Sequence, residues 1–161
     1  MNYNNANPAT GAAPAVLDEI LAVWSQAATP WSAADLGDLY TEDACLFGGR
    51  PGHSIGRAAI TGYFASYDKI IRCASIKPLD QEVSRLNRET IIAQGHVEFT
   101  FLLAAGNDTK NLLRSTLILR KEEERWKIWH HWLSLWLQMA QLMYRSMDFV
   151  SIAVPLSPEL R

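Results

Sequence analysis

Residues 110–137 read KNLLRSTLILRKEEERWKIWHHWLSLWL, and this stretch decides the fold. Two apolar runs rich in Leu, Ile and Trp occupy residues 110–122 and 125–137, and each has the composition of a β-strand. Glu123 and Glu124 separate the runs, and a two-residue connection is typical of a β-hairpin. The stretch therefore predicts two long antiparallel strands.

Further strand-like runs come before this hairpin. Residues 71–79, 81–85 and 90–104 are bounded by turn signals, and the Gly-Asn-Asp sequence at 106–108 fits another hairpin connection. A short strand is also expected at residues 44–47. Together with residues 110–137, these runs predict one antiparallel sheet.

Helical patterns fill the first part of the chain. Apolar residues at helical spacing predict a first helix from about Val16 to about Ala28. Ser32 is a candidate N-cap for a short helix that ends near Tyr40, and a third helix is expected from Arg57 to about residue 70. Three helices followed by a run of strands predict an α+β fold, with the helices on one face of a curved antiparallel sheet.

Length and composition predict a single domain. A chain of 161 residues suffices for one core, which we assign to residues 15–137. Residues 1–14 are rich in Asn, Ala and Pro, lack the pattern of a signal peptide, and are expected to form a flexible tail. Residues 138–161 form a C-terminal extension, in which 138–150 permit a helix and 151–161 are expected to be irregular. No stretch reaches the length of a membrane span, so we expect a cytoplasmic protein.

The composition also narrows the function. A net charge of −2 without a basic stripe argues against nucleic-acid binding. Cys45 and Cys73 lack the spacing of a disulfide framework or a zinc site, and no glycine-rich phosphate loop is present. His130 and His131 are neighbours on a strand and point to opposite faces, so we expect neither a metal nor a cofactor. Six Trp and five Phe predict a cavity lined with aromatic rings, which suits an apolar small molecule.

Four short stretches carry a family resemblance. They are DLGDLYTEDA at 35–44, GRAAITGYF at 56–64, RSTLILR at 114–120 and WKIWHHWLS at 126–134. In this order they resemble the SnoaL-like branch of the NTF2-like superfamily, which includes polyketide cyclases and ketosteroid isomerases. The resemblance implies a cone-shaped fold with a small-molecule pocket. Related final strands often carry His where this chain has Trp132, which puts a bulky ring in place of a polar group.

Strand alternation selects candidate catalytic residues. If Ile128 faces the concave side of the sheet, then His130 and Trp132 do so too. His130 is then the candidate for proton transfer to a carbonyl compound, or a histidine that only satisfies a hydrogen bond. Arg114 and Thr116 share a face of the preceding strand, where Arg114 is a candidate partner for an enolate oxygen. Alternatively, Arg114 forms an ion pair with Glu98 or Asp43.

The strand at 90–104 leaves two arrangements open. If its polar row faces the cavity, Glu98 becomes a candidate general base with a raised pKa. If its apolar row faces inward, His96 and Glu98 lie on the surface or in an interface. We favour the second arrangement, because four apolar side chains need burial.

The remaining predicted pocket residues are mostly aromatic. His53 lies on a Gly- and Pro-rich loop at the expected mouth of the cone, as a binding group or as a solvated histidine. Tyrosine hydroxyls that face inward can donate to an oxyanion. The predicted walls are Trp24, Tyr40, Phe47, Tyr63, Phe64, Thr116 and Trp132.

Two functions fit these features. The first is a cofactor-free enzyme that resembles SnoaL-like proteins and catalyses isomerisation, cyclisation or dehydration of an apolar carbonyl compound. The second is a non-catalytic ligand-binding or dimerisation module. In either case a homodimer is expected, with Trp129, His131 and Leu133 on the outer sheet face against a second copy.

Overall fold

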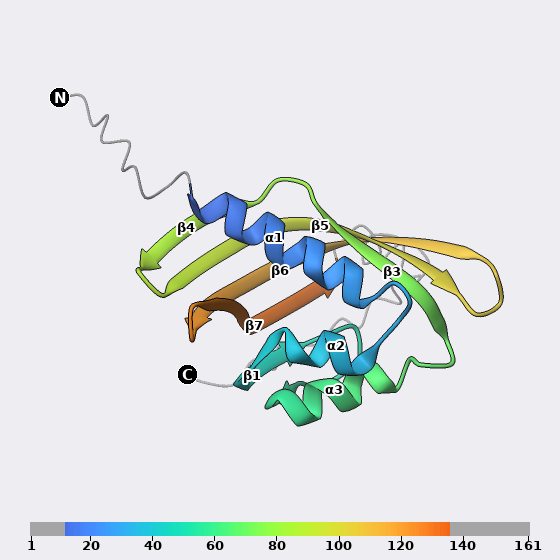
Figure 1. The fold of residues 1–161 in the computed structure, drawn as a ribbon. Helices are drawn as coiled ribbons and strands as arrows, with labels where there is room; N and C mark the ends of the chain where they lie inside the picture. Colours follow the sequence, from blue (N-terminus) through green and yellow to red (C-terminus); the bar gives the residue numbers. More distant parts are fainter. Residues whose placement is uncertain (1–11, 136–161) are drawn as a thin grey trace, which may run out of the picture.

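The computed structural model describes residues 12–135, which form three helices and one mixed sheet. Figure 1 shows α1 lying across the sheet, with α2 and α3 beside β1. The helices are α1 (Ala12–Ala27), α2 (Ala33–Asp38) and α3 (Arg57–Ala65). The strands are β1 (Tyr40–Phe47), β2 (Ser54–Ile55), β3 (Ile71–Pro78), β4 (Glu82–Asn87), β5 (Thr90–Leu103), β6 (Asp108–Glu122) and β7 (Arg125–Leu135).

Most of the predicted helices and strands are present, with shifted ends. Helix α1 begins at Ala12, inside the predicted tail, and α3 ends at Ala65 instead of near residue 70. The side chain of Ser32 accepts a hydrogen bond from the Asp35 backbone N–H, which confirms the predicted cap of α2. Residues 138–161 lie outside the described part of the chain. Among residues 12–135, we find no helix whose length and apolar character would allow it to cross a membrane.

The sheet has the strand order β2-β1-β7-β6-β5-β3, with β4 also paired to β5. Strands β5, β6 and β7 form a continuous antiparallel meander. The prediction of a fully antiparallel sheet was wrong in one place, because β1 runs parallel to β7. A short apolar run carries no information about strand direction, which here depends on the connection from β1 through α3 to the later strands.

The core lies between α1 and the inner face of the sheet. Leu17, Leu21 and Trp24 of α1 are buried, and the Trp24 ring meets Phe99 of β5 edge to face with 5.5 Å between centres. Val97 and Phe99 are buried as well, whereas Glu98 between them is only half-buried. The apolar row of β5 therefore faces inward, which confirms the arrangement favoured from the sequence.

A β-bulge in β7 changes which side chains face the cavity. Ile128 is paired with Leu119 and His130 with the next residue, Ile118, so Trp129 is an extra residue in β7. An extra residue reverses the alternation of side chains beyond it. His131 is consequently buried on the inner face. The prediction that His130 and Trp132 face the concave side was wrong for this reason.

Candidate functional site

An aromatic cavity of about 350 Å³ lies inside the fold. It is lined by side chains from α1, α3, β1, β3, β5, β6 and β7 and by residues of the loops that follow α1, β1 and α3. Edge-to-face contacts hold the rings, with centres 5.9 Å apart for Trp31 and Phe64 and 6.4 Å apart for Trp24 and Trp31. The rings in the wall include Trp24, Trp31, Tyr63, Phe64, Tyr67 and Phe99.

A buried polar pair lies in this largely apolar wall, which also includes Thr109 and Asn111. The Tyr40 hydroxyl lies 2.9 Å from His131 Nδ1, and the two rings are stacked with 6.3 Å between centres. Both residues line the cavity, and His131 is only 3% exposed. Tyr40 comes from β1 and His131 from β7, and these neighbouring strands meet at the bulge. The bulge therefore brings the imidazole to the tyrosine.

Burial determines the protonation of both groups. Loss of solvation lowers the pKa of His131 from 6.5 to about 4, so the imidazole is neutral at neutral pH. Burial also raises the pKa of the Tyr40 hydroxyl far above its ordinary value, although the nearby Trp24 indole N–H opposes this effect. The hydroxyl therefore keeps its proton.

A neutral imidazole gives this pair two hydrogen-bonding arrangements. If Tyr40 donates to Nδ1, then Nε2 carries the proton and can donate to a ligand oxygen. If Nδ1 donates to Tyr40, then Nε2 is a proton acceptor. Nε2 of His131 is buried and has no hydrogen-bond partner among the described residues. This atom is the reactive position that the arrangement offers.

Two further tyrosines, Tyr63 and Tyr67, also line the cavity. The Tyr63 hydroxyl accepts a hydrogen bond from the Gly49 N–H at 2.9 Å, and Arg50 donates to the Tyr67 hydroxyl at 3.1 Å. A Cβ atom at residue 48 would lie 2.2 Å from the Tyr63 hydroxyl, so Gly48 allows the ring to approach the loop. Partial burial raises the pKa of Tyr63, which stays protonated and uncharged.

Four of the predicted pocket residues line the cavity: Trp24, Tyr40, Tyr63 and Phe64. Phe47 and Trp132 lie on the outer face instead, where their rings stack with 4.9 Å between centres. The His53 ring stacks on Phe47, also at 4.9 Å. The prediction that Phe47 and Trp132 form part of the cavity wall is therefore wrong, and Trp132 does not fill the cavity. His53, predicted as a binding group or a solvated histidine at the cavity mouth, does not line the cavity.

The other predicted polar residues lie on the outer face too. On β6, Arg114 and Thr116 alternate with Ser115 and Leu117, which are buried. Glu98 of β5 is within 3.4 Å of Lys110 and is not a buried base. Neither predicted partner of Arg114 is bonded to it, since Glu98 pairs with Lys110 and Asp43 with Arg120.

Strand alternation predicted that His131 and Leu133 lie on the outer face, whereas both line the cavity. Plain alternation from Ile128 gives the wrong face for every residue after the bulge. The apolar pattern gives no signal for the bulge, because His131 and Leu133 share a face with or without the extra residue.

The described residues offer little else for chemistry. We find no group of three or more His, Cys, Asp or Glu side chains between residues 12 and 135 that could hold a metal ion. Cys45 and Cys73 are free thiols and half-buried.

Comparisons with known proteins agree with this architecture. A protein from Xanthomonas campestris, provisionally assigned as a calcium/calmodulin dependent protein kinase II association domain, matches with a TM-score of 0.68 and 21% identity, over 86% of this chain and 99% of that one. A provisionally assigned scytalone dehydratase from Novosphingobium aromaticivorans has a TM-score of 0.68 and 13% identity, over 77% and 84%. An NTF2-like superfamily protein from Salmonella enterica has a TM-score of 0.62 and 17% identity, over 78% and 92%. These likenesses show an NTF2-like α+β fold.

The family assignment rests on a separate comparison. No curated protein matched the sequence. A family model of the SnoaL-like domain, in contrast, matches residues 17–138, which is most of the chain and includes every element that lines the cavity except the start of α1. The chain therefore belongs to the family of SnoaL-like domains.

Proposed function

We propose that the protein binds an apolar small molecule with a carbonyl group in this cavity and catalyses a cofactor-free proton transfer on it. Isomerisation, cyclisation and dehydration all belong to this class. The observation that carries the proposal is the buried Tyr40–His131 pair, which lines a largely apolar cavity and whose Nε2 has no hydrogen-bond partner among the described residues. A volume of about 350 Å³ is small for a ligand site and suits a compact ring system.

The pair can move one proton without any other group. Nε2 removes a proton from the carbon beside the carbonyl, and the two electrons of that C–H bond form the enolate. The Tyr40 hydroxyl accepts a hydrogen bond from Nδ1–H and holds the new imidazolium. Return of the proton to a different carbon completes an isomerisation and restores the neutral imidazole.

The low basicity of buried His131 is compatible with this role. Burial alone lowers the pKa of His131, because an isolated cation is poorly solvated there. An enolate that forms next to the imidazole is an opposite charge and favours the protonated form. The structural neighbour assigned as a scytalone dehydratase shares the fold, which makes dehydration substrates the first to test.

Ligand retention tests the proposed cavity directly. We expect native mass spectrometry of the purified protein, followed by denaturing extraction, to detect a discrete aromatic or polycyclic compound. Leu133→Trp should abolish retention because the larger ring fills the cavity. Leu112→Trp is the matched control and should retain the compound, because Leu112 is an exposed side chain on β6. Equal retention by both variants would contradict the proposal.

A second candidate function is self-association through the outer sheet face. Trp132 is 58% exposed and stacked on Phe47, which leaves a large aromatic surface open. Trp129 also lies on this face, as predicted, whereas His131 and Leu133 do not. The Xanthomonas neighbour is named as an association domain, which supports a test of this second function.

If the protein forms a homodimer through this face, a charge introduced there should dissociate the dimer. Trp132→Asp should convert a dimer to a monomer in sedimentation velocity, because the carboxylate would be buried at the interface. Leu86→Asp on β4 is the control, since Leu86 is 60% exposed but lies on a strand that pairs only with β5. A wild-type protein that stays monomeric at about 100 μM would argue against the dimer.

A further inference from the structure

The hydrophobic pattern of β7 does not determine which of its faces lies inward beyond Ile128. With the bulge, His131 and Leu133 face the cavity. Without the bulge, regular alternation would place His130 and Trp132 at the two cavity-facing positions that His131 and Leu133 occupy. Each set has one histidine and one large apolar side chain, so burial of apolar surface favours neither strongly. Another contact must keep the extra residue at Trp129.

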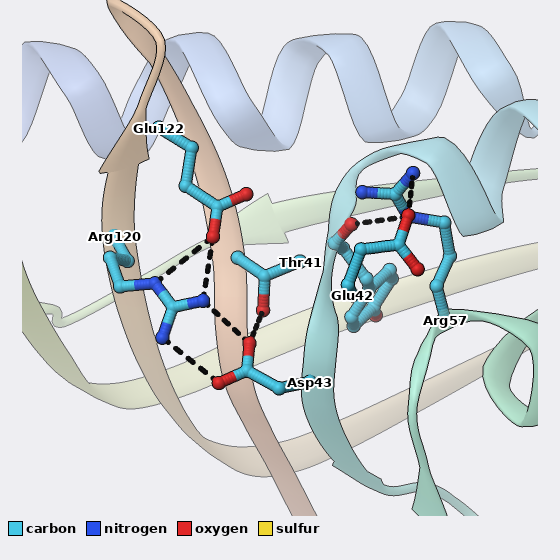
Figure 2. Close-up of polar contacts among 7 residues, drawn as sticks. Thr41, Glu42, Asp43, Arg57, Arg120 and Glu122 are labelled. Carbon is cyan, nitrogen blue, oxygen red and sulfur yellow. Dashed lines mark hydrogen bonds and ion pairs between the residues drawn. The ribbon is translucent and has the colours of Figure 1, made fainter.

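Such a contact surrounds Trp129 on the outer face. The Arg120 guanidinium carbon lies 4.8 Å from the centre of the Trp129 ring. As Figure 2 shows, the same guanidinium bonds Asp43 of β1 and Glu122 of β6. Nη1 reaches Asp43 Oδ2 at 3.1 Å, while Nη2 bonds the other Asp43 oxygen and lies 2.6 Å from Glu122. We call Arg120, Asp43, Glu122 and Trp129 the Arg120 clamp.

We propose that the Arg120 clamp fixes the bulge at Trp129 and thereby positions His131 in the cavity and keeps Trp132 out of it. Its residues are positioning residues, because none of them lines the cavity. The catalytic consequence rests on the proposed function, but the placement of the side chains does not.

Arg120 makes more contacts in the clamp than it would in an ordinary surface ion pair. The guanidinium binds one carboxylate with two nitrogens, approaches a second carboxylate and stacks on an indole ring. The hydrogen bonds from Arg120 hold the pKa of Asp43 well below its usual range. The Thr41 hydroxyl also donates to Asp43 at 2.9 Å and fixes the carboxylate from within β1. A network of this kind is directional, unlike an isolated pair.

The clamp acts where β1 and β7 lose their regular pairing. Tyr40 is paired with Ile128 and Cys45 with His130, so four residues of β1 lie opposite Trp129 alone. Asp43 belongs to this irregular part of β1, and Arg120 ties it to β6 across the extra residue. The stack of Phe47 on Trp132 keeps the second ring outside but lies beyond the bulge. This stack therefore helps to keep Trp132 outside the cavity, but it does not determine where in β7 the extra residue lies.

Histidine NMR tests the proposal without any ligand. In ¹⁵N-labelled wild-type protein, His131 should stay neutral until the pH approaches its pKa of about 4. In Arg120→Ala, we expect the pKa of His131 to rise by about one unit or more, because part of the population turns this ring into solvent. Glu42→Ala is the matched control, since Glu42 adjoins Asp43 but forms an ion pair with Arg57, with 2.7 Å between Oε1 and Nη1. Figure 2 shows this pair beside the clamp. The control variant should leave the His131 titration unchanged.

Deletion of Trp129 separates positioning from general loss of structure. Without the extra residue, Ile128 is followed directly by His130, and regular alternation from Ile128 turns His131 inward. The deletion combined with Arg120→Ala should therefore restore the low pKa of His131. Asp43→Ala replaces Arg120→Ala if the latter does not fold, and should shift the pKa in the same direction.

Two results would overturn the proposal. One is a folded Arg120→Ala or Asp43→Ala variant in which His131 titrates as in the wild type. The other is an Arg120→Ala variant in which deletion of Trp129 does not restore the low pKa of His131. If the NMR results agree while every candidate substrate fails, then the clamp stands and the proposed function is wrong.

Discussion

His131→Phe should lower kcat by about 100- to 10,000-fold on the true substrate, the range expected when a general acid–base group is removed. Phenylalanine keeps a planar aromatic ring, slightly larger than imidazole, but lacks both nitrogens. The cavity should therefore keep its shape and continue to bind the ligand, so KM should change much less than kcat. Steady-state kinetics on the compound recovered from the native protein would measure both parameters.

The adjacent histidine supplies the control for this experiment. His130 is half-buried on the outer face, where its ring meets Trp129 at 4.8 Å between centres. His130→Phe should leave kcat within about twofold of the wild type, since the group does not touch the cavity. The reverse result, with His130 essential and His131 dispensable, would contradict the site assignment and the register of β7 together.

Removal of the imidazole also leaves the Tyr40 hydroxyl without its partner. A buried polar group that loses its hydrogen bond costs about 1–3 kcal/mol of stability. The double variant Tyr40→Phe, His131→Phe should recover part of this loss, because two apolar rings then face each other. Such recovery without any recovery of kcat would assign the loss of activity to chemistry and not to folding.

Local patterns account for most of the fold but for less of the site. The alternation in residues 90–104 correctly places Val97 and Phe99 in the core, because that strand is regular over the residues that face α1. The cap at Ser32 is likewise a local signal. Residues in regular strands next to long apolar rows can thus be assigned to a face from sequence alone.

The errors in the site share one physical origin. His130, Trp132 and His131 were each assigned to the wrong face by the single extra residue at Trp129. The bulge depends on Arg120 and Asp43, which are 77 positions apart in the sequence and meet only in the folded sheet. Alternation within one strand contains no trace of such a contact. Phe47 was misplaced in the same way, because its face follows from its pairing with Trp132 in β7.

Acid should destabilise the protein through His131 between pH 6.5 and about 4. In the unfolded chain this histidine binds a proton below its ordinary pKa of 6.5, whereas in the folded protein it does so only near 4. Over this interval the unfolded state holds more protons, so the free energy of unfolding falls as the pH falls. The full interval corresponds to about 3 kcal/mol, and the effect levels off below pH 4.

Urea unfolding of wild type and His131→Phe at pH 6.5, 5.5 and 4.5 would measure this effect. Over this range the wild type should lose about 1 kcal/mol per pH unit more than the variant, because the variant lacks the buried titrating group. The carboxyl groups of Asp43 and Asp80 have lowered pKa values and contribute only below 3.8. Parallel stability curves for the two proteins would mean that His131 is solvated in the folded state. The cavity would then admit water to Nε2, and the desolvated proton transfer proposed for this site would lose its physical basis.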